Sequence, residues 1–434
     1  MSRRLRLTGL LRHPSEPRVL LLRGDRTWRL PRVATKTDTW LADVRVAGRA
    51  WERRLGTRPW LLRRLAHSHD EERDVLDALQ ELELVDPAWT PPRNGRWASR
   101  EDVERLRVDE EHAGLASGYL DRLGEVPPQR PAWSRPGWHA PLREWLEAEL
   151  GEVALEQAKV WGISTVVRAD AAPGERWFKA SAPLPLFVNE AVVTEWLAGR
   201  FPGYVPRPVA ADRERGWLLF EPFDVLGWHL PLGERRELFR RFAELQLRTV
   251  ELTEELLAVG CLDRRPPVLA HQLDELLADR RALHRLEPAE VRKLRRLRPR
   301  LHELIGRLDA LGLPPTLVHG DLHPGNAMRL DGRIAYFDWT DACVAHPFVD
   351  LHSLQWEPDE ATRAAILDAY LEPWRAVAPE ATLREAVALA GVVTPLHHAV
   401  SYSTIARSLE PTSRSELDAT HEFLREATTR LQEL

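Results

Sequence analysis

The chain has 434 residues with 61 basic and 66 acidic side chains, a net charge of −5 that excludes a general nucleic-acid binder with a strongly basic face. Its 44% hydrophobic and 29% charged residues are typical of a soluble globular protein, and only Cys261 and Cys343 occur, which excludes a disulfide framework. No apolar run reaches the roughly 18–20 residues that span a bilayer, and no signal-peptide pattern follows the basic start. We therefore expect a cytoplasmic protein with neither a membrane nor a nucleic-acid partner.

At the start of the chain, apolar runs alternate with turn signals. The run 18–23 (RVLLLR) predicts a strand, and 43–55 predicts a helix. A second helical pattern covers 70–84, and a short third covers 100–106. These elements predict a mixed α/β domain over residues 1–123.

A proline-rich stretch follows this domain. Residues 124–141 read GEVPPQRPAWSRPGWHAP and contain five prolines. Because proline fixes φ and lacks an N–H donor, neither a helix nor a central strand can run through it. We therefore expect a linker at 124–140 between two domains.

After the linker we expect a mixture of helices and strands. A helix is predicted at 141–150, followed by strands near 164–168 and 176–180 with a turn at 172–174 between them. A helix at 187–199 and a strand at 216–221 come next. From 230 to about 311 the pattern is helical, and a strand begins at 317. A hairpin turn at Asp331-Gly332 follows, since this pair favours positive φ. Helices return from 360, so a sheet-rich unit precedes a helical unit with a short β insertion.

One short stretch carries the residues of phosphoryl transfer. Residues 317–351 contain His319, Asp321, Asn326 and Asp338 within 20 positions. This chemistry needs a carboxylate that positions a hydroxyl and accepts its proton, and oxygen ligands for the Mg²⁺ that bridges the phosphates. His-x-Asp with Asn five residues after the Asp has the spacing of a kinase catalytic loop, and Asp338 follows a strand-like run where the second metal ligand is expected.

A zinc site is the alternative interpretation of this stretch. His319, Asp321 and His323 alternate along the chain, and His and Asp side chains can ligate zinc. That interpretation leaves Asn326 and Asp338 without a role. We therefore prefer phosphotransfer, with His323 as a residue that packs the loop.

The segment HGDLHPGN, the later Asp338-Trp339 and the following PFVD resemble the aminoglycoside phosphotransferase and choline kinase group. The resemblance covers about 141–434. It implies an α+β, protein-kinase-like bilobal phosphotransferase fold that uses ATP and Mg²⁺, with an N-lobe at 141–225 and a helical C-lobe at 226–434.

The same resemblance implies roles for individual residues. Asp321 is the catalytic base, and Asn326 and Asp338 are the metal ligands. His319 supports the loop, and Asp350 ties down the catalytic segment.

The phosphate-anchoring side is expected upstream. Lys179, in the strand-like RWFKA, matches the lysine that contacts the α- and β-phosphates in the resembled fold. An acid on the next helix should orient this ammonium group. Glu190 is the first choice and Glu195 the second.

The resemblance also implies contacts to the nucleotide. Residues 161–165 lack the G-x-G-x-x-G of protein kinases, but a turn with Ser164 and Thr165 can meet phosphate oxygens through hydroxyl and N–H groups. Glu221 ends the run 216–221, where the resembled fold links its lobes and holds the adenine.

The first domain resembles a degenerate Nudix hydrolase. Trp28-Arg29-Leu30-Pro31 matches the family's opening, and Arg49 and Gly56 keep the framework of its metal-binding helix. Three acids of that helix are replaced, by Ala50, Arg53 and Arg54. A divalent metal has no carboxylate cluster to bind there, so we expect a separate, small Nudix-like scaffold without hydrolase activity.

The leading functional hypothesis is an enzyme that phosphorylates a hydroxyl of a small molecule, with an aminoglycoside-, choline- or sugar-like acceptor. A non-catalytic ATP-binding regulatory protein is the second class. A protein kinase is the third, although no Ala-Pro-Glu segment follows Asp338. The acceptor and the oligomeric state stay open.

Overall fold

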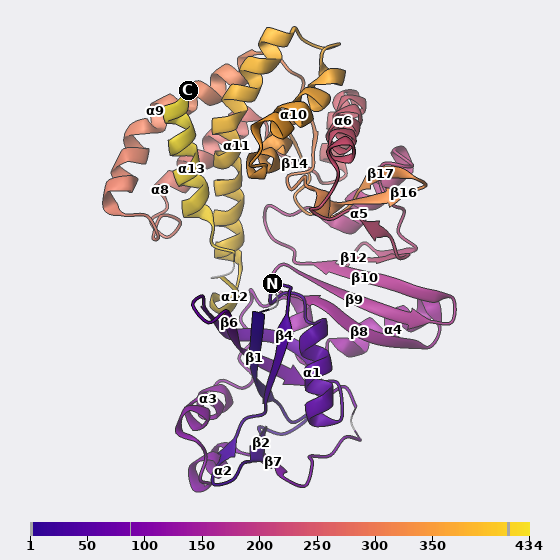
Figure 1. The fold of residues 1–434 in the computed structure, drawn as a ribbon, viewed down its shortest axis with the longest axis vertical. Coiled ribbons are helices and arrows are strands. Elements are labelled where there is room, and N and C mark those ends of the chain that lie inside the picture. Colours follow the sequence, from indigo (N-terminus) through magenta and orange to yellow (C-terminus); the bar gives the residue numbers. More distant parts are fainter. Residues whose placement is uncertain (1–2, 87, 415–416) are drawn as a thin grey trace. The chain divides into compact units, whose positions relative to one another are not determined.

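The computed structural model describes residues 3–86, 88–414 and 417–434, which belong to two compact units (Figure 1). The first unit comprises Met1–Ala182 and Leu409–Ser415, and the second comprises Pro183–Ser408 and Glu416–Leu434. A short segment from near the C-terminus therefore belongs with the N-terminal residues. The units group the chain differently from the four segments expected from the sequence, whose boundaries stay a prediction.

The N-terminal part of the first unit contains two small sheets. One has the order β4-β1-β6-β5, with β1 and β6 parallel, and the other has the order β3-β2-β7. Their strands are β1 Arg3–Leu11, β2 Val19–Arg23, β3 Trp28–Arg29, β4 Arg32–Thr37, β5 Trp60–Asp70, β6 Val75–Glu83 and β7 Gly95–Ala98. The helices are α1 Arg45–Leu55, α2 Arg100–Arg105 and α3 Glu110–Leu120.

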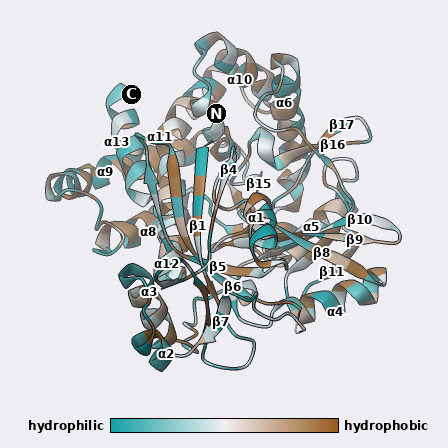
Figure 2. Ribbon diagram, turned by 60° about the horizontal axis from the view of Figure 1, so that its bottom comes forward, coloured by the Kyte–Doolittle hydropathy of each residue, from teal (hydrophilic) through white to brown (hydrophobic). Residues whose placement is uncertain are grey.

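The strand at 18–23 and the helices at 43–55 and 100–106 are confirmed, but the helical pattern at 70–84 was wrong, because β6 runs there. β6 lies between β1 and β5 and is buried along most of its length. Its apolar residues do not alternate, because Gln80, Glu81 and Glu83 are buried as well, and the resulting spacing imitates a helical pattern. The contrast is visible in β1, where hydrophilic and hydrophobic bands alternate (Figure 2).

The proline-rich stretch contains no strand and one short 3₁₀ helix, Ala132–Ser134, before α4 His139–Leu150. It is not a loose connection, because Trp133 and Trp138 are 3% and 7% exposed. The Trp138 ring lies 6.3 Å from the ring of Trp60 on β5. The stretch is therefore packed into the first unit.

Three antiparallel strands follow α4: β8 Val153–Val160, β9 Ser164–Ala171 and β10 Gly174–Ser181. They confirm both expected strands and the turn between them. In the register of these strands, Val166 pairs with Lys159 on one side and with Lys179 on the other. Two of the chain's four lysines therefore occupy one cross-strand row.

The second unit is mainly helical. Its helices are α5 Glu190–Arg200, α6 Leu232–Thr249, α7 Thr253–Ala258, α8 Pro266–Ala278, α9 Pro288–Ala310, α10 Glu360–Trp374, α11 Glu380–Ser408 and α13 Thr420–Glu433. None of the described helices, in either unit, is long and apolar enough to cross a membrane.

Short strands interrupt these helices. They are β11 Ala210–Asp212, β12 Trp217–Phe220, β13 Asp224–Val225, β14 Leu262–Asp263, β15 Thr316–Val318, β16 Ala327–Leu330, β17 Arg333–Tyr336 and β18 Cys343–Ala345. The turn between β16 and β17 has positive φ at Asp331 (50°) and Gly332 (74°), which confirms the predicted hairpin.

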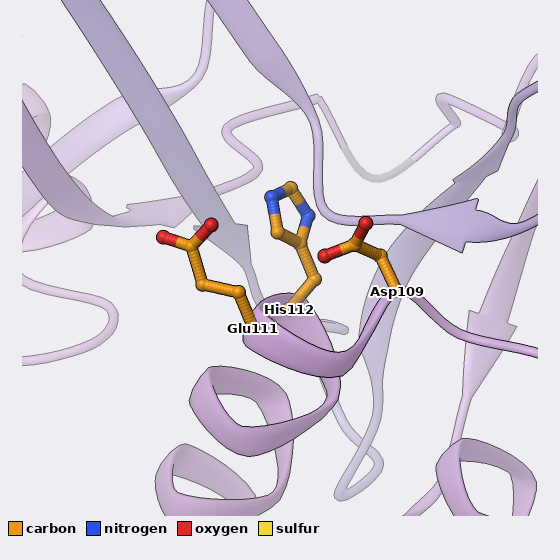
Figure 3. A group of neighbouring side chains, drawn as sticks. All are labelled: Asp109, Glu111 and His112. Carbon is orange, nitrogen blue, oxygen red and sulfur yellow. The ribbon is translucent and has the colours of Figure 1, made fainter.

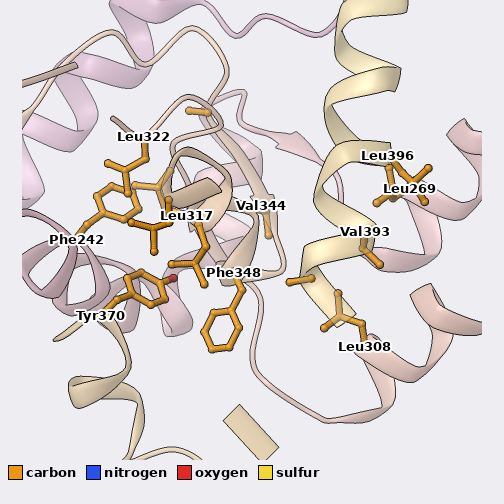
Figure 4. Packing of buried hydrophobic residues seen from close by; sticks show 14 of the residues in the cluster. Phe242, Leu269, Leu308, Leu317, Leu322, Val344, Phe348, Tyr370, Val393 and Leu396 are labelled. Carbon is orange, nitrogen blue, oxygen red and sulfur yellow. The ribbon is translucent and has the colours of Figure 1, made fainter. Parts of the chain in front are cut away.

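The core of the second unit lies directly beneath the loop after β15. Phe242, Leu317, Phe348 and Tyr370 are all fully buried there (Figure 4). The Tyr370 hydroxyl donates to Gln246 Oε1 at 2.5 Å, so this apolar core also holds a buried polar group in a fixed place. The loop above it therefore starts from a rigid base.

Candidate active site

The loop after β15 is anchored by one buried carboxylate. Asp350 is 2% exposed and accepts backbone N–H bonds from His319 (3.0 Å) and Gly320 (2.9 Å). A third bond comes from Gln246 Nε2 at 3.0 Å. Burial raises the pKa of Asp350 to about 7, while the three donors favour its charged form. The expected role of Asp350 in tying down the catalytic segment is confirmed.

His319 links the loop to the end of β17. Its Nε2 donates to the Phe337 carbonyl at 3.0 Å, and its Nδ1 accepts the Asp321 N–H at 3.3 Å. Acceptance at Nδ1 requires a neutral ring with its proton on Nε2, and burial indeed lowers the pKa of His319. The expected supporting role is therefore confirmed, and both ring nitrogens are occupied, which argues against the zinc interpretation.

Asp321 and Asn326 are in direct contact. Asn326 Nδ2 donates to the Asp321 carbonyl and to Asp321 Oδ2, at 2.9 Å each. His323 accepts the Gly325 N–H at Nδ1, so its Nε2 carries the proton and lies 3.4 Å from Asp321 Oδ2. Burial raises the pKa of Asp321, but the hydrogen bond from His323 and the electrostatic attraction of His323 and His319 outweigh it, and the net shift is downward. Asp321 is therefore an ionised carboxylate at neutral pH.

Asp338 follows β17 with φ of +66°, a conformation that non-glycine residues rarely adopt. Thr340 Oγ1 lies 3.1 Å from Asp338 Oδ1 and 3.1 Å from Asp341 Oδ2. The next N–H, of Trp339, donates to the buried carboxylate of Glu190 at 3.2 Å. Glu190 thus helps to hold the Asp-Trp segment, and its expected pairing with Lys179 stays a prediction.

Asp341 is a site residue that the sequence interpretation missed. Gly320 has φ of +82°, and a Cβ there would lie 2.6 Å from the Asp341 carbonyl oxygen, so the two segments touch. Burial and the charges of Asp321 and Asp338 raise the pKa of Asp341 to about 7. The sequence feature that could have identified Asp341 is its position three residues after Asp338, in the motif Asp-Trp-x-Asp.

The donor set fits magnesium. The Asn326 amide nitrogen is turned to Asp321, which leaves the amide oxygen as the atom that can ligate a cation. The carboxylates of Asp321, Asp338 and Asp341 interact unfavourably with one another, and a divalent cation would relieve this repulsion. Hard oxygen ligands are the ones that Mg²⁺ prefers.

An aromatic face lies beside Asp321. The Trp228 ring stacks on His323 with centroids 4.6 Å apart, and Trp356 lies 5.6 Å from Trp228. Both tryptophans expose about half of their surface, 52% and 54%. Gly325 permits the stack, because a Cβ there would lie 2.8 Å from the His323 ring.

The aromatic face continues inward through His352, whose ring lies 5.7 Å from Trp356, and His398, which is 4.5 Å from His352. Burial lowers the pKa of His352 to about 4 and that of His398 well below its ordinary value. Both rings are therefore neutral at physiological pH, so these inner members add no positive charge to the face.

The expected nucleotide residues of the first unit lie on or beside β9 and β10. Lys179 is half-buried on β10. The Thr165 hydroxyl is buried and donates to the Lys159 carbonyl at 3.0 Å, and the Ser164 hydroxyl accepts the Trp161 indole N–H at 2.6 Å. Thr165 therefore has its hydroxyl proton committed, while Ser164 keeps one to donate.

Two residues expected near the nucleotide lie at the surface of the second unit. Glu221 is exposed, directly after β12. Glu195, the second choice for the acid, pairs with Arg213 at 2.7 Å. The choice of Glu190 over Glu195 as the acid that orients Lys179 stays a prediction.

A cluster on the N-terminal part brings together Asp109, Glu111 and His112, whose ligand atoms lie within 4.8 Å (Figure 3). His112 Nδ1 accepts the Leu30 N–H at 2.8 Å, and burial lowers the pKa of this ring. A neutral ring with one accepting nitrogen carries its proton on the other, so neither nitrogen is available to a metal. His112 instead holds the backbone of the 28–31 motif.

Comparisons with known proteins agree with the presence of a phosphotransferase site. Residues 164–380, half of the chain, match the model described as the phosphotransferase enzyme family. No curated protein matches the chain. The matched residues lie outside 1–123, so the Nudix-like expectation stays a prediction.

Solved structures give the fold. The choline kinase LicA from Streptococcus pneumoniae is 17% identical with a TM-score of 0.50, over 68% of this chain and 99% of LicA. The macrolide 2′-phosphotransferase MphH from Brachybacterium faecium is 22% identical with a TM-score of 0.46, over 65% and 96%. The likeness to LicA shows the kinase-like phosphotransferase fold.

Proposed function

Since this chain belongs to the phosphotransferase enzyme family, we propose that it transfers the γ-phosphoryl group of ATP to a hydroxyl of a small molecule. The observation that carries the proposal is the contact of Asn326 with Asp321, at 2.9 Å to both the carbonyl and Oδ2. That contact orients an ionised carboxylate on a rigid loop, which is what a hydroxyl acceptor needs.

Asp321 acts as the positioning group and base. Its Oδ atoms accept the acceptor's hydroxyl proton while the oxygen attacks the γ-phosphorus, and the bond from that phosphorus to the β,γ-bridging oxygen breaks. The charge on Asp321 is favoured by His323, whose Nε2 proton faces Oδ2. His323 thereby helps to keep the base ionised.

Magnesium, when bound, would be held by Asn326 Oδ1 and the Asp338 carboxylate and would screen the phosphate charges. Lys179 would contact the α- and β-phosphates, and Glu190 would orient it. Residues 161–165 would contact the phosphates through the Ser164 hydroxyl and backbone N–H groups, and the chain at Glu221 would contact the adenine. The Thr165 hydroxyl is bound to the Lys159 carbonyl and stabilises the strand pair instead.

The acceptor is proposed to lie on the aromatic face. Trp228 and Trp356 present exposed rings beside Asp321, and sugar rings and flat heterocycles stack on such faces. A ring-bearing acceptor fits this face better than a polycation, which would need several carboxylates. We propose that the enzyme works in the cytoplasm without a membrane or nucleic-acid partner.

A metabolite panel tests this function. The full-length protein is incubated with ATP, Mg²⁺ and hydroxyl-bearing small molecules, among them glycosides, nucleosides, choline and aminoglycosides, and products are identified by mass spectrometry. The proposal expects one class to gain a single phosphoryl group with equal formation of ADP. ATP binding without transfer to any compound of a broad panel would favour a non-catalytic role instead.

A further inference from the structure

The turn between β8 and β9, residues 161–163, is fixed by its neighbours in the first unit. The Trp133 indole N–H donates to the Trp161 carbonyl at 2.9 Å, and the Trp161 indole donates to Ser164 Oγ. Lys159 Nζ lies 4.4 Å from the centre of the Trp161 ring. The stretch that the sequence marked as a linker thus supplies a direct hydrogen bond to this turn.

A segment from the far end of the chain packs on the same turn. A Cβ at Gly162 would lie 3.0 Å from Ser413 Cβ and 3.3 Å from Leu409 Cδ2. A side chain at position 162 would therefore press on both of these residues, and no positive φ is involved. Ser413 belongs to α12 Pro411–Arg414, and Leu409 is 1% exposed.

Glu410 anchors this segment through buried charges. Its Oε2 accepts from Arg63 at 2.9 Å and from Arg130 at 3.2 Å. The side chains of Glu410, Arg63 and Arg130 are 3%, 14% and 7% exposed. Breaking a buried ion pair leaves an uncompensated charge in the interior, so these contacts are costly to break.

The anchor continues into the N-terminal sheet. Arg63 on β5 also donates to Glu81 Oε2 on β6 at 2.7 Å, and the Tyr119 hydroxyl donates to Glu81 Oε1 at 2.8 Å. Glu81 is 4% exposed on its side chain. The segment 409–414 is therefore tied, through a chain of buried polar contacts, to the region that otherwise has no assigned role.

We propose that segment 409–414 is a positioning element for nucleotide binding, with Glu410 as its anchor and Ser413 as its contact to Gly162. It fixes the turn whose N–H groups meet the phosphates, and it makes the N-terminal region part of the nucleotide site. The inference rests on the proposed role of residues 161–165 in ATP binding.

A paired substitution tests the contact. Gly162→Ala places a methyl group against Ser413, and overpacking of this kind displaces backbone, so ATP affinity should fall about fivefold or more. The double variant Gly162→Ala/Ser413→Gly removes the opposing Cβ and should recover most of the affinity. Gly114→Ala, on α3 with no heavy atom near its Cβ position, is the matched control and should bind ATP as the wild type does. Affinities are measured by titration calorimetry of the full chain with ATP and Mg²⁺.

The anchor is tested with Glu410→Gln, and Glu422→Gln, a 71% exposed acid, is its control. We expect a higher Kd and KM for ATP from Glu410→Gln with kcat largely unchanged. If Glu410→Gln loses thermal stability but keeps its ATP affinity, Glu410 is purely structural and the inference is overturned. The inference is also overturned if Gly162→Ala binds ATP normally, or if Ser413→Gly does not restore its affinity. A wild-type chain that does not bind ATP would refute the proposed function itself.

Discussion

Asn326 donates its side-chain amide to both the carbonyl and the Oδ2 atom of Asp321, at 2.9 Å each. One side chain thus fixes the orientation of the carboxylate and turns its own oxygen away from it. Base and metal ligand are therefore built as a pair. Loss of either should affect the other.

Substitution of Asn326 separates these two functions. Asn326→Ala removes both the donor and the metal ligand, and we expect turnover to fall by at least about 10²-fold. Asn326→Asp keeps an oxygen ligand but loses the N–H donor, so it should retain Mg²⁺ dependence while kcat still falls. Steady-state kinetics over a Mg²⁺ series distinguishes the variants, and equal loss of metal affinity in both would contradict the division of roles.

Asp350→Asn tests the anchor of the loop. The asparagine amide has only one oxygen, whereas His319 and Gly320 donate to different oxygens of Asp350. At least one of these N–H groups is therefore left unpaired in the core, at a cost of about 1–3 kcal/mol. Thermal unfolding should show this loss together with reduced kcat. The exposed Asp368→Asn serves as the control, and an Asp350→Asn variant with unchanged stability would contradict the anchoring role.

The aromatic face predicts a selective effect on the acceptor. Trp228→Ala should raise KM for the acceptor roughly three- to tenfold and leave KM for ATP unchanged, because stacking is lost only on the acceptor side. Trp228→Phe keeps a ring and should recover most of the affinity. Equal effects on both substrates would indicate a general disturbance of the loop.

His346 predicts how stability depends on pH. Burial lowers its pKa to about 3, against about 6.5 in the unfolded chain, so the unfolded state binds an additional proton between these values. Stability from this group is present above pH 6.5 and falls by about 1.4 kcal/mol per pH unit below it. His346→Asn keeps an acceptor for the Phe348 N–H but does not titrate, so its unfolding free energy should fall less between pH 6.5 and 4. Equal slopes in denaturant titrations would refute this assignment.

The catalytic loop could be predicted from the sequence because Asp321 and Asn326 are five residues apart and contact each other within one turn. Asp341 was missed, since its proximity to Gly320 depends on how β17 returns to the loop. The pair Arg63–Glu410 spans 347 residues and leaves no local signal. β6 was misjudged for a related reason, because the burial of both its faces is decided by its neighbours in the sheet.

The most direct measurement is the turnover of Asp321→Asn with the acceptor that the metabolite panel identifies. The amide has nearly the shape of the carboxylate but cannot accept the hydroxyl proton, so kcat should fall by at least about 10²-fold while calorimetry shows ATP binding close to that of the wild type. Undiminished phosphoryl transfer by this variant would contradict the assignment of Asp321 as the base and, with it, the proposed mechanism.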